Sequence, residues 1–366
     1  MRLLILISTA LIFSLGLMMV FNTSSAEVLD RSLNQSLHYA LLKQILYAVV
    51  GCGCAFLVWR IGYDHLLHLS VPLLILGLFL LLLVFVPGLG SSRGGAKRWI
   101  VIGNFSFQPS EFMKYIMPMA YIEYITTRKE GVISLKTFLK IATVMMVPIM
   151  LVAVEPDNGT AAVMSAALLP LFYVSGIRFK YWALPVIILV GICAVVAFQL
   201  PYVKARLQVY LHPELDMKGK GHQPHQAKIA TGSGKFLGRG AGASRQKLTY
   251  LPEAQNDYIA AIYAEEFGFL GILVLLFLYL LFAYGGFSIA MHTPASSAQL
   301  FAMVITFLIT FQAFLNLGVA SGLLPSKGIN LPFFSQGGTS LVANITAVAL
   351  LLHIAQKNDE AKKSHT

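Results

Sequence analysis

Four acidic side chains lie close together in the stretch YLPEAQNDYIAAIYAEEFGF: Glu253, Asp257, Glu265 and Glu266. The whole chain has only 16 acidic residues among 366, and the segment that follows, 267–326, contains no Asp, Glu, Lys or Arg. At 100° per residue, Glu253 and Asp257 would share one helix face, whereas Glu265 and Glu266 lie about 12 Å or more farther along the axis. Glu265 and Glu266 therefore cannot act on the same atom as Asp257.

Some of these acids could have a structural role instead of a catalytic one. A charged side chain within a bilayer costs about 2.5–3.5 kcal/mol on insertion scales, so it faces a bundle interior or a wet cavity. Glu265 and Glu266 can serve as helix-packing or interfacial acids near the inner leaflet. Asp257 differs because it stands at the mouth of its helix, directly after a basic loop. A carboxylate that faces cations at a membrane surface is a candidate general base, and Glu253 is its competitor.

Cations gather in two segments near these acids. The segment 201–256 holds nine Lys or Arg against three acids, and 93–114 holds four against one. In RGGAKRWI, the guanidinium of Arg98 offers paired donors to phosphate oxygens, and Lys97 stands beside it. The alternative is interfacial anchoring, with Trp99 at headgroup depth and the two cations reaching toward water. An excess of cations on one face favours an anionic ligand.

Two further motifs each allow a structural and a functional interpretation. In QPSEFMK, Glu111 and Lys114 are three residues apart and would share a helix face, either as a local ion pair behind a cap at Gln108 or Ser110 or as ligand contacts. In VEPDNGT, Asp157 has turn and N-cap chemistry, and a metal or substrate contact is the alternative.

The glycine-rich stretch GSGKFLGRGAGASRQKLTYLPE does not form a phosphate-binding P-loop. That motif needs Gly-x₄-Gly-Lys-Ser/Thr, but position 229 is Ile and Phe236 follows Lys235. What remains is a flexible, cationic loop suited to headgroups or an anionic substrate. Arg245 and Lys247 in this loop are therefore candidate substrate contacts.

The elements that carry these residues are apolar helices. The chain is 57% hydrophobic with a mean hydropathy of +0.72, which indicates a polytopic membrane protein. Helices satisfy their backbone groups locally in lipid, so we expect an all-α fold in one domain, 1–366. Gly285, Gly286 and Pro294 should supply a turn within the long uncharged run. The expected spans are near 3–22, 42–60, 66–87, 109–126, 139–154, 160–176, 182–200, 257–284, 298–320 and 339–356.

Ten spans would place both termini on one side and the longer connections on the other. Those connections are 87–115, 201–256 and 321–340, with the turn 154–160 beside them. Basic clusters at 128–140 and 357–363 favour cytoplasmic termini. The basic residues at 93–98 oppose that orientation, whereas a loop as long as 201–256 counts little.

Six motifs follow one another along the chain: GAKRWI (95–100), QPSEFMK (108–114), EPDNGT (155–160), GRGAGASRQKLTYLPEAQND (238–257), EEFGFLG (265–271) and NLGVASGLLPSKGINLPFFSQGGTSL (316–341). In these motifs and their order the chain resembles the SEDS proteins, the FtsW/RodA/SpoVE family of peptidoglycan polymerases. The resemblance covers nearly the whole chain, and ASRQKLTYLPEA and LLPSKG look most like the division-type FtsW branch.

The resemblance implies an inverting glycosyltransferase that joins lipid II units, in which an undecaprenyl diphosphate carries a disaccharide-peptide. The family's catalytic aspartate matches Asp257, and its phosphate-contacting cations match Arg98 and Lys114. The sequence departs from the family pattern at Gln255-Asn256, Asn158 and Gln336, and the first departure excludes a relay through a histidine at 255. The expected substrate-binding set is Lys97, Arg98, Glu111, Lys114, Asp157, Arg245, Lys247, Glu253 and Lys327.

The resemblance also implies a setting. We expect a bacterial inner-membrane protein with its active site outside, whose partners are a class B penicillin-binding transpeptidase and other divisome membrane proteins. Mg²⁺ could share the diphosphate charge, but no ligand set in the sequence identifies a metal site. The alternatives are an elongation-type RodA polymerase, an inactive scaffold, or a lipid II flippase with a proton path through Glu123, Glu265 and Glu266. No inverted repeat supports the flippase.

Overall fold

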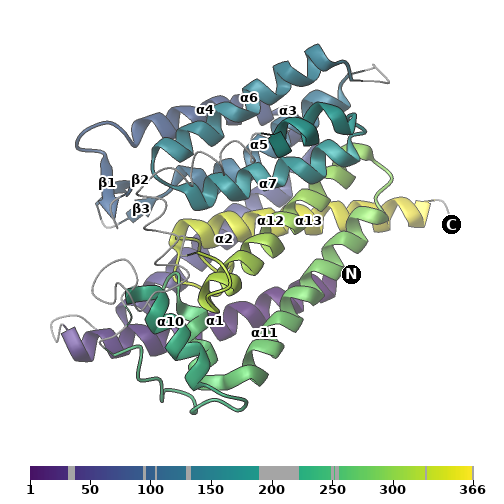
Figure 1. Cartoon of the computed structure of the whole chain (residues 1–366). Coiled ribbons are helices and arrows are strands. Elements are labelled where there is room, and N and C mark those ends of the chain that lie inside the picture. The colour runs from purple at the N-terminus through teal and green to yellow at the C-terminus, as the bar shows by residue number, and fades with distance from the viewer. Residues whose placement is uncertain are drawn as a thin grey trace.

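The computed structural model is a bundle of helices with a small sheet at one end (Figure 1). It describes residues 1–31, 38–93, 96–103, 105–128, 133–188, 222–248, 251, 255–325 and 328–364. Among these, six helices are long and apolar enough to cross a membrane: α1 (Arg2–Arg31), α2 (Tyr39–Ile61), α6 (Leu135–Val154), α11 (Ile259–Met291), α12 (Ser296–Ala320) and α13 (Gly338–Ser364). The shorter described helices are α3 (Tyr63–His68), α4 (Ser70–Leu83), α5 (Pro109–Thr126), α7 (Asn158–Val174), Phe179–Ile188 and α10 (His222–Ser233).

The helices fall where the apolar runs predict them. The fourth expected span coincides with α5, and the third is divided into α3 and α4 at Leu69. The seventh expected span, 182–200, is helical as far as Ile188 and then continues outside the described residues. The count of ten spans therefore stays a prediction, whereas the helical class of the membrane part is confirmed.

Both ends of the chain lie at the same end of the bundle. Arg2 at the start of α1 forms an ion pair with Asp359 near the end of α13, with 2.9 Å between Nη2 and Oδ2. Lys357 also pairs with Asp64 at the start of α3. These pairs agree with the expectation that the termini share one side.

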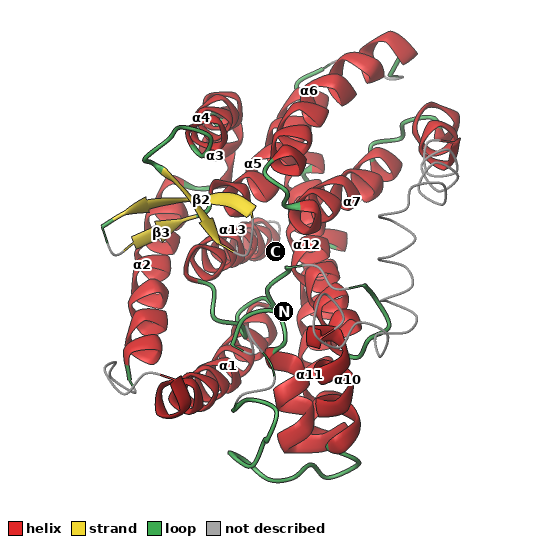
Figure 2. Ribbon diagram, turned by 60° about the vertical axis from the view of Figure 1, so that its left-hand side comes forward, coloured by secondary structure: helices red, strands yellow, loops and turns green. Residues whose placement is uncertain are grey.

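The small sheet is the part that an all-α prediction missed. Strands β1 (Gly90–Arg93), β2 (Ala96–Ile102) and β3 (Phe105–Phe107) pair antiparallel in that order. The second half of AKRWIVI consists of Trp99 and three β-branched residues, 100–102, and such residues favour a strand. Figure 1 shows the sheet at the end of the molecule away from the termini, and Figure 2 shows its strands as yellow arrows among the helices. Arg98 lies in β2 between Lys97 and Trp99, at an irregularity of the ladder where no residue of β1 is paired with it.

The glycines expected to form a turn instead allow helices to pack closely. Gly285 and Gly286 lie inside α11, which continues to Met291. A Cβ on Gly286 would lie 2.2 Å from Thr306 Oγ1 on α12, and one on Gly285 would lie 2.9 Å from a methyl of Leu4 on α1. Small residues at such contacts bring membrane helices together where lipid offers no hydrophobic driving force. The turn expected at these glycines is wrong; the chain reverses at residues 292–295.

Helix α11 is interrupted at Gly268, whose φ of 67° and ψ of −164° are not helical. The interruption leaves helix-end carbonyls and amides that need partners. Arg239 and Gly240 donate backbone N–H groups to the carbonyls of Glu265 and Glu266, at 3.0 Å each. Phe269 and Leu270 donate to the carbonyls of Lys235 and Phe236, at 2.9 and 3.2 Å. The loop after α10 therefore completes the hydrogen bonding of the broken helix.

Candidate active site

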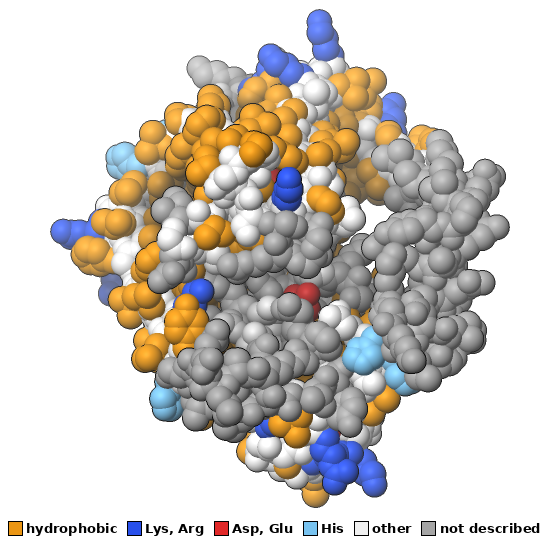
Figure 3. All heavy atoms as spheres, turned by 90° about the vertical axis from the view of Figure 1, so that its left-hand side faces the viewer, with side chains coloured by type: hydrophobic (Ala, Val, Ile, Leu, Met, Phe, Trp, Pro, Cys, Tyr) orange, Lys and Arg blue, Asp and Glu red, His pale blue; other side chains and the backbone are white. Residues whose placement is uncertain are grey.

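A cavity of about 640 Å³ opens at the end of the bundle that carries the sheet. Figure 3 looks onto this end and shows an acidic side chain near the middle of a hollowed face. The connections predicted to emerge together do meet here, because β2, the segment before α11 and the segment between α12 and α13 all contribute. The lining residues are Lys43, Gln44, Tyr47, Arg98, Trp99, Ser106, Gln108, Glu111, Lys114, Thr160, Val163, Gln223, Gln255, Asn256, Asp257, Gln312, Gly328, Ile329, Asn330, Gln336, Gly337 and Gly338.

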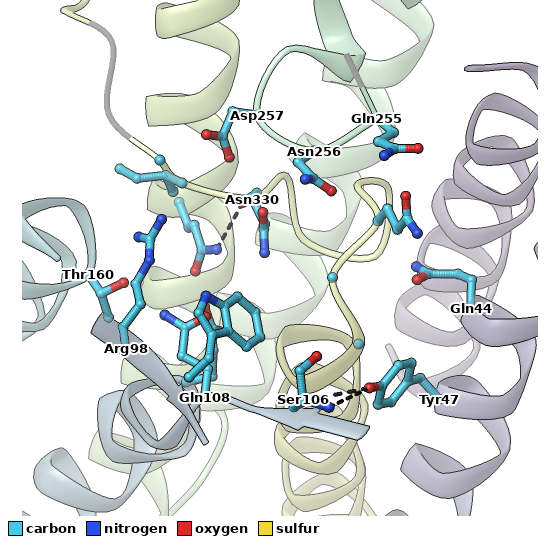
Figure 4. Close-up of a pocket in the computed structure, with 18 of the residues that line it drawn as sticks. Gln44, Tyr47, Arg98, Ser106, Gln108, Thr160, Gln255, Asn256, Asp257 and Asn330 are labelled. Atoms are coloured by element: carbon cyan, nitrogen blue, oxygen red, sulfur yellow. Dashed lines mark hydrogen bonds between the residues drawn. The ribbon is translucent and has the colours of Figure 1, made fainter. Parts of the chain in front are cut away.

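Arg98 and Asp257 converge on one point in this cavity. A Cβ built on Gly328 would lie 3.2 Å from Arg98 Nη2, 3.5 Å from Arg98 Nη1 and 3.3 Å from Asp257 Oδ2. The guanidinium and the carboxylate thus flank a position that only glycine leaves open. Figure 4 shows the two side chains on the same side of the cavity. This arrangement places a proton acceptor, the Asp257 carboxylate, and a phosphate-binding group, the Arg98 guanidinium, within reach of one substrate.

Asp157 holds Arg98 in place. Its Oδ1 accepts from Arg98 Nη1 at 3.2 Å and from the backbone N–H of Thr160 at 3.2 Å, and its Oδ2 accepts from Gln108 Nε2 at 2.9 Å. The predicted N-cap of α7 is therefore confirmed, and the same carboxylate supports the arginine. The Arg98 Nε atom is buried and has no hydrogen-bond partner in the described part of the chain.

A second acid lies directly before this carboxylate. Glu155 follows the last residue of α6, is fully buried, and neither of its oxygens has a hydrogen-bond partner among the described residues. Burial, and then the negative charge of Asp157, raise the pKa of Glu155 to about 8, although Arg98 opposes this shift. Burial also raises the pKa of Asp157 against the opposing effect of Arg98. The turn 155–157 therefore carries one carboxyl group that prefers its neutral form.

Glu111 and Lys114 form the predicted local ion pair, with 2.7 Å between Lys114 Nζ and Glu111 Oε2. The ammonium also donates to Gln312 Oε1 on α12 at 2.9 Å. Lys114 is only 1% exposed, so its charge is already neutralised inside the bundle. Both residues touch the cavity, but their contacts bind α5 to α12 rather than leave the lysine open to a ligand.

The backbone around Asp257 is held by α12 and by the segment between α12 and α13. Asn316 Nδ2 donates to the carbonyl of Asp257 at 3.0 Å and to that of Ile329 at 2.7 Å. Ser335 Oγ donates to the carbonyl of Asn256 at 2.8 Å, and the Gln336 N–H donates to the carbonyl of Gln255 at 3.0 Å. Asp257 precedes α11 by two residues and is not part of that helix. Sequence reasoning missed Asn316 and Ser335 as supports, although both lie in the long motif 316–341.

Glu265 and Glu266 form a separate cluster that anchors the loop after α10. Glu265 accepts from Ser244 Oγ at 2.6 Å and lies 3.5 Å from Arg239 Nη1. Glu266 accepts from Lys247 Nζ at 2.9 Å. Both acids are 1% exposed. These contacts agree with the helix-packing alternative for the two acids, because both acids hold the loop after α10 against α11.

The remaining predicted site residues are placed as follows. Lys247 is buried against Glu266, and Asn22 of α1 accepts from its ammonium at 2.6 Å. Arg245 is exposed, and neither Arg245 nor Lys247 lines the cavity. Lys97 is exposed and also does not line it. The flexible, ligand-facing loop expected here is instead held by an ion-paired cluster, because Glu265 and Glu266 offer its cations nearer partners.

Two predicted contacts, Glu253 and Lys327, lie outside the described residues. Within the described part of the chain, no group of three or more His, Cys, Asp or Glu side chains could hold a metal ion. A site for the Mg²⁺ considered above therefore has no ligand set in this part of the molecule.

Comparison with known proteins agrees with this geometry. The FtsW/RodA/SpoVE family model, described as cell cycle protein, matches residues 2–360. The chain is 36% identical to the probable peptidoglycan glycosyltransferase FtsW of Legionella pneumophila, over 94% of this chain and 88% of that protein. It is 35% identical to the stage V sporulation protein E of Bacillus subtilis, over 97% of this chain and 96% of that protein.

Solved structures agree as well. A chain from a peptidoglycan synthase complex, described as coordinating polymerization and crosslinking, superimposes with a TM-score of 0.79 at 26% identity, and 97% of each chain is covered. The Rod shape determining protein RodA of Thermus thermophilus superimposes with a TM-score of 0.69 at 25% identity, over 97% of this chain and 96% of that one. With several apolar helices and a family match along nearly its whole length, this chain is a multi-pass membrane protein that belongs to the FtsW/RodA/SpoVE family.

Proposed function

We propose that this protein is a peptidoglycan glycosyltransferase that joins lipid II units into glycan strands. The observation that carries the proposal is the convergence of Arg98 and Asp257 on one open point beside Gly328, in a cavity of about 640 Å³. The Legionella pneumophila relative, named probable peptidoglycan glycosyltransferase FtsW, supports the same activity. Its 36% identity over 94% of this chain also favours the division-type role over the elongation-type one.

Asp257 is the general base of the proposed reaction. Its carboxylate accepts the proton of the acceptor sugar's 4-hydroxyl as that oxygen attacks the anomeric carbon of the donor. A new glycosidic C–O bond forms, the bond between the anomeric carbon and the diphosphate oxygen breaks, and the lipid diphosphate leaves with the electron pair. Attack on the face opposite the leaving group inverts the anomeric centre. Because a diphosphate leaves without protonation, one base is sufficient and a second catalytic carboxyl group is not needed.

Arg98 stabilises the charge that develops on the departing diphosphate. A guanidinium offers planar, paired donors that match phosphate oxygens. Asp157 and the strand β2 fix its position, so little reorganisation is needed during the reaction. The unpartnered Arg98 Nε supports this role, because a buried donor without a partner is costly unless a ligand supplies one.

The same proposal includes the membrane, the orientation and the partners of the protein. The protein lies in the bacterial inner membrane with both termini in the cytoplasm and the cavity on the outer face, where lipid II sugars are polymerised. A class B penicillin-binding transpeptidase is its partner, and it works among other divisome membrane proteins. The superposition on a chain of a peptidoglycan synthase complex supports a partner of this kind.

A transporter is the competing function, and the acids that it would use favour the enzyme instead. Glu265 and Glu266 hold the loop after α10. Glu123 lies at the other end of the molecule, 2.8 Å from His68 Nδ1. These acids are thus engaged in two separate clusters rather than lining one common cavity among the described residues.

The decisive experiment uses the purified chain and lipid II, with and without the transpeptidase, and separates the products by length. We expect glycan strands from the wild-type protein and none from an Asp257→Asn variant that elutes and melts like the wild type. Absence of strands from the wild-type complex would reject the enzyme. A parallel flipping assay in vesicles with fluorescent lipid II would detect the transporter.

A further inference from the structure

Among the described residues, three cations line the cavity, and they differ in how their charges are neutralised. Arg98 is paired with Asp157, and Lys114 is paired with Glu111 and bonded to Gln312. Lys43 on α2 has no carboxylate partner in the described part of the chain; its Nζ lies 5.7 Å from the centroid of the Tyr39 ring. Of these three cations, Lys43 is therefore the one whose charge a ligand can still neutralise.

The wall that carries Lys43 lies across the cavity from the reacting groups. Figure 4 shows Gln44 and Tyr47 of α2 on the side opposite Arg98 and Asp257. This wall is fixed, because Gln44 Nε2 donates to the carbonyl of Ser335 at 3.1 Å and the Tyr47 hydroxyl bonds the backbone of Ser106 at 3.4 Å. Lys43 thus stands on a helix that is hydrogen-bonded to the segment before α13 and to β3.

The proposed reaction supplies two diphosphates that must be held apart. In the donor, the diphosphate is bonded to the anomeric carbon, so it lies next to Asp257 and Arg98 during transfer. In the acceptor, the reacting 4-hydroxyl is on the outer sugar, and the diphosphate is at the far end of the disaccharide. A second cationic site is therefore needed at a disaccharide's length from Asp257, on another wall of the same cavity.

We propose that Lys43 binds the diphosphate of the acceptor lipid, while Arg98 binds that of the donor. This inference rests on the proposed function and assigns the two substrates to two walls of one cavity. The Gln336 Oε1 atom, buried at the cavity without a described partner, offers an acceptor to a hydroxyl or acetamido N–H of the sugar between them. The competing role for Lys43 is interfacial anchoring through the Tyr39 ring.

The experiment separates the two substrate roles with two analogues of lipid II. A donor-only analogue lacks the 4-hydroxyl of its outer sugar. An acceptor-only analogue carries a methylene group in place of the anomeric oxygen, so its diphosphate cannot leave. Together they allow one transfer, whose lipid-linked tetrasaccharide product is quantified while each analogue is varied in turn.

Lys43→Met should raise KM for the acceptor-only analogue about tenfold and leave KM for the donor-only analogue and kcat within about twofold, because one charge-assisted contact is lost. Lys43→Arg should restore the acceptor KM. Lys140→Met removes an exposed lysine of α6 outside the cavity and serves as the matched control. Binding of the acceptor-only analogue to Asp257→Asn, with and without Lys43→Met, gives a readout that does not depend on turnover.

The outcomes separate this inference from the proposed function. An unchanged acceptor KM, an equal rise for both analogues, or a fall in kcat alone would each reject the acceptor site at Lys43. Those results leave the polymerase intact as long as the wild type joins the analogues and Asp257→Asn does not. If the wild type forms no product, the proposed function itself is rejected. A melting curve of Lys43→Met that matches the wild type ensures that a folding defect is not read as a binding defect.

Discussion

Arg98 and Asp257 face each other across the open side of Gly328, and a Cβ at that position would lie 3.2 Å from the guanidinium and 3.3 Å from the carboxylate. The two residues are 159 positions apart in sequence and reach this point from β2 and from the turn before α11. Gly328 comes from a third segment, between α12 and α13. The space that its missing side chain leaves is where we place the anomeric carbon and the leaving diphosphate.

Gly328→Ala should therefore abolish most activity without unfolding the protein. The new methyl group would occupy the space between the two reacting groups, and a displacement of about 1 Å at an active site can cost about 10²-fold in rate. Strand synthesis from lipid II checks this. Gly53→Ala is the matched control, because a Cβ there meets nothing within 4 Å; equal activity of the two variants would contradict the geometry.

Asp257→Asn should reduce polymerisation by about 10²–10⁴-fold, which is the usual cost of removing a positioned base. The amide is nearly isosteric, so the bond from Asn316 to the backbone carbonyl should survive. Co-purification with the transpeptidase reports on folding. Glu253→Gln should do less damage, and near-total loss in that variant alone would move the base to Glu253.

Arg98→Lys should impair the reaction even though the charge is kept, because the ammonium has no planar fork for a diphosphate. We expect the donor KM to rise and kcat to fall, together by about tenfold or more. The single-transfer assay with the two analogues measures both parameters. If Arg98→Ala polymerises lipid II at the wild-type rate, Arg98 is only an interfacial anchor.

Glu155 should make stability decrease as the pH rises. Its pKa lies at about 8 in the folded protein against 4.5 ordinarily, so between these values the folded state binds more protons than the unfolded state. Stability is then lost progressively from about pH 4.5 to 8, by up to about 1.4 kcal/mol per pH unit. Glu155→Gln should flatten the dependence of the melting temperature on pH in detergent. A steeper dependence in the variant would be the opposite of what the buried, unpartnered carboxyl predicts.

A cysteine at position 237 should report the orientation in the membrane. Leu237 is 73% exposed in the loop after α10. In a background without the three native cysteines, an impermeant thiol reagent should label Leu237→Cys in intact spheroplasts, whereas Ala361→Cys near the end of α13 should be labelled only after lysis. The reverse pattern would overturn the outer location of the cavity.

The sequence by itself determined the features that depend on neighbouring residues. Long apolar runs specify helices because lipid leaves backbone groups no other partner, so α5 begins and ends where its hydropathy predicts. The same locality predicts the cap of α7 by Asp157 and the pairing of Glu111 with Lys114. The resemblance to known motifs also singles out Arg98 and Asp257, although they are remote in the sequence.

Only the tertiary structure decided which distant groups meet. In the sequence, Glu265, Glu266 and Lys247 lie within 20 residues of one another. Only the structure shows that the two acids pair with the cations of the loop, which therefore do not face the cavity. Hydropathy gives no signal that Lys43, on the opposite wall, lines that cavity. The physical reason is that helix positions follow from local backbone and solvent energetics, whereas the site depends on how rigid helices pack. That packing is fixed by close contacts such as Gly286 on Thr306, between residues remote in sequence.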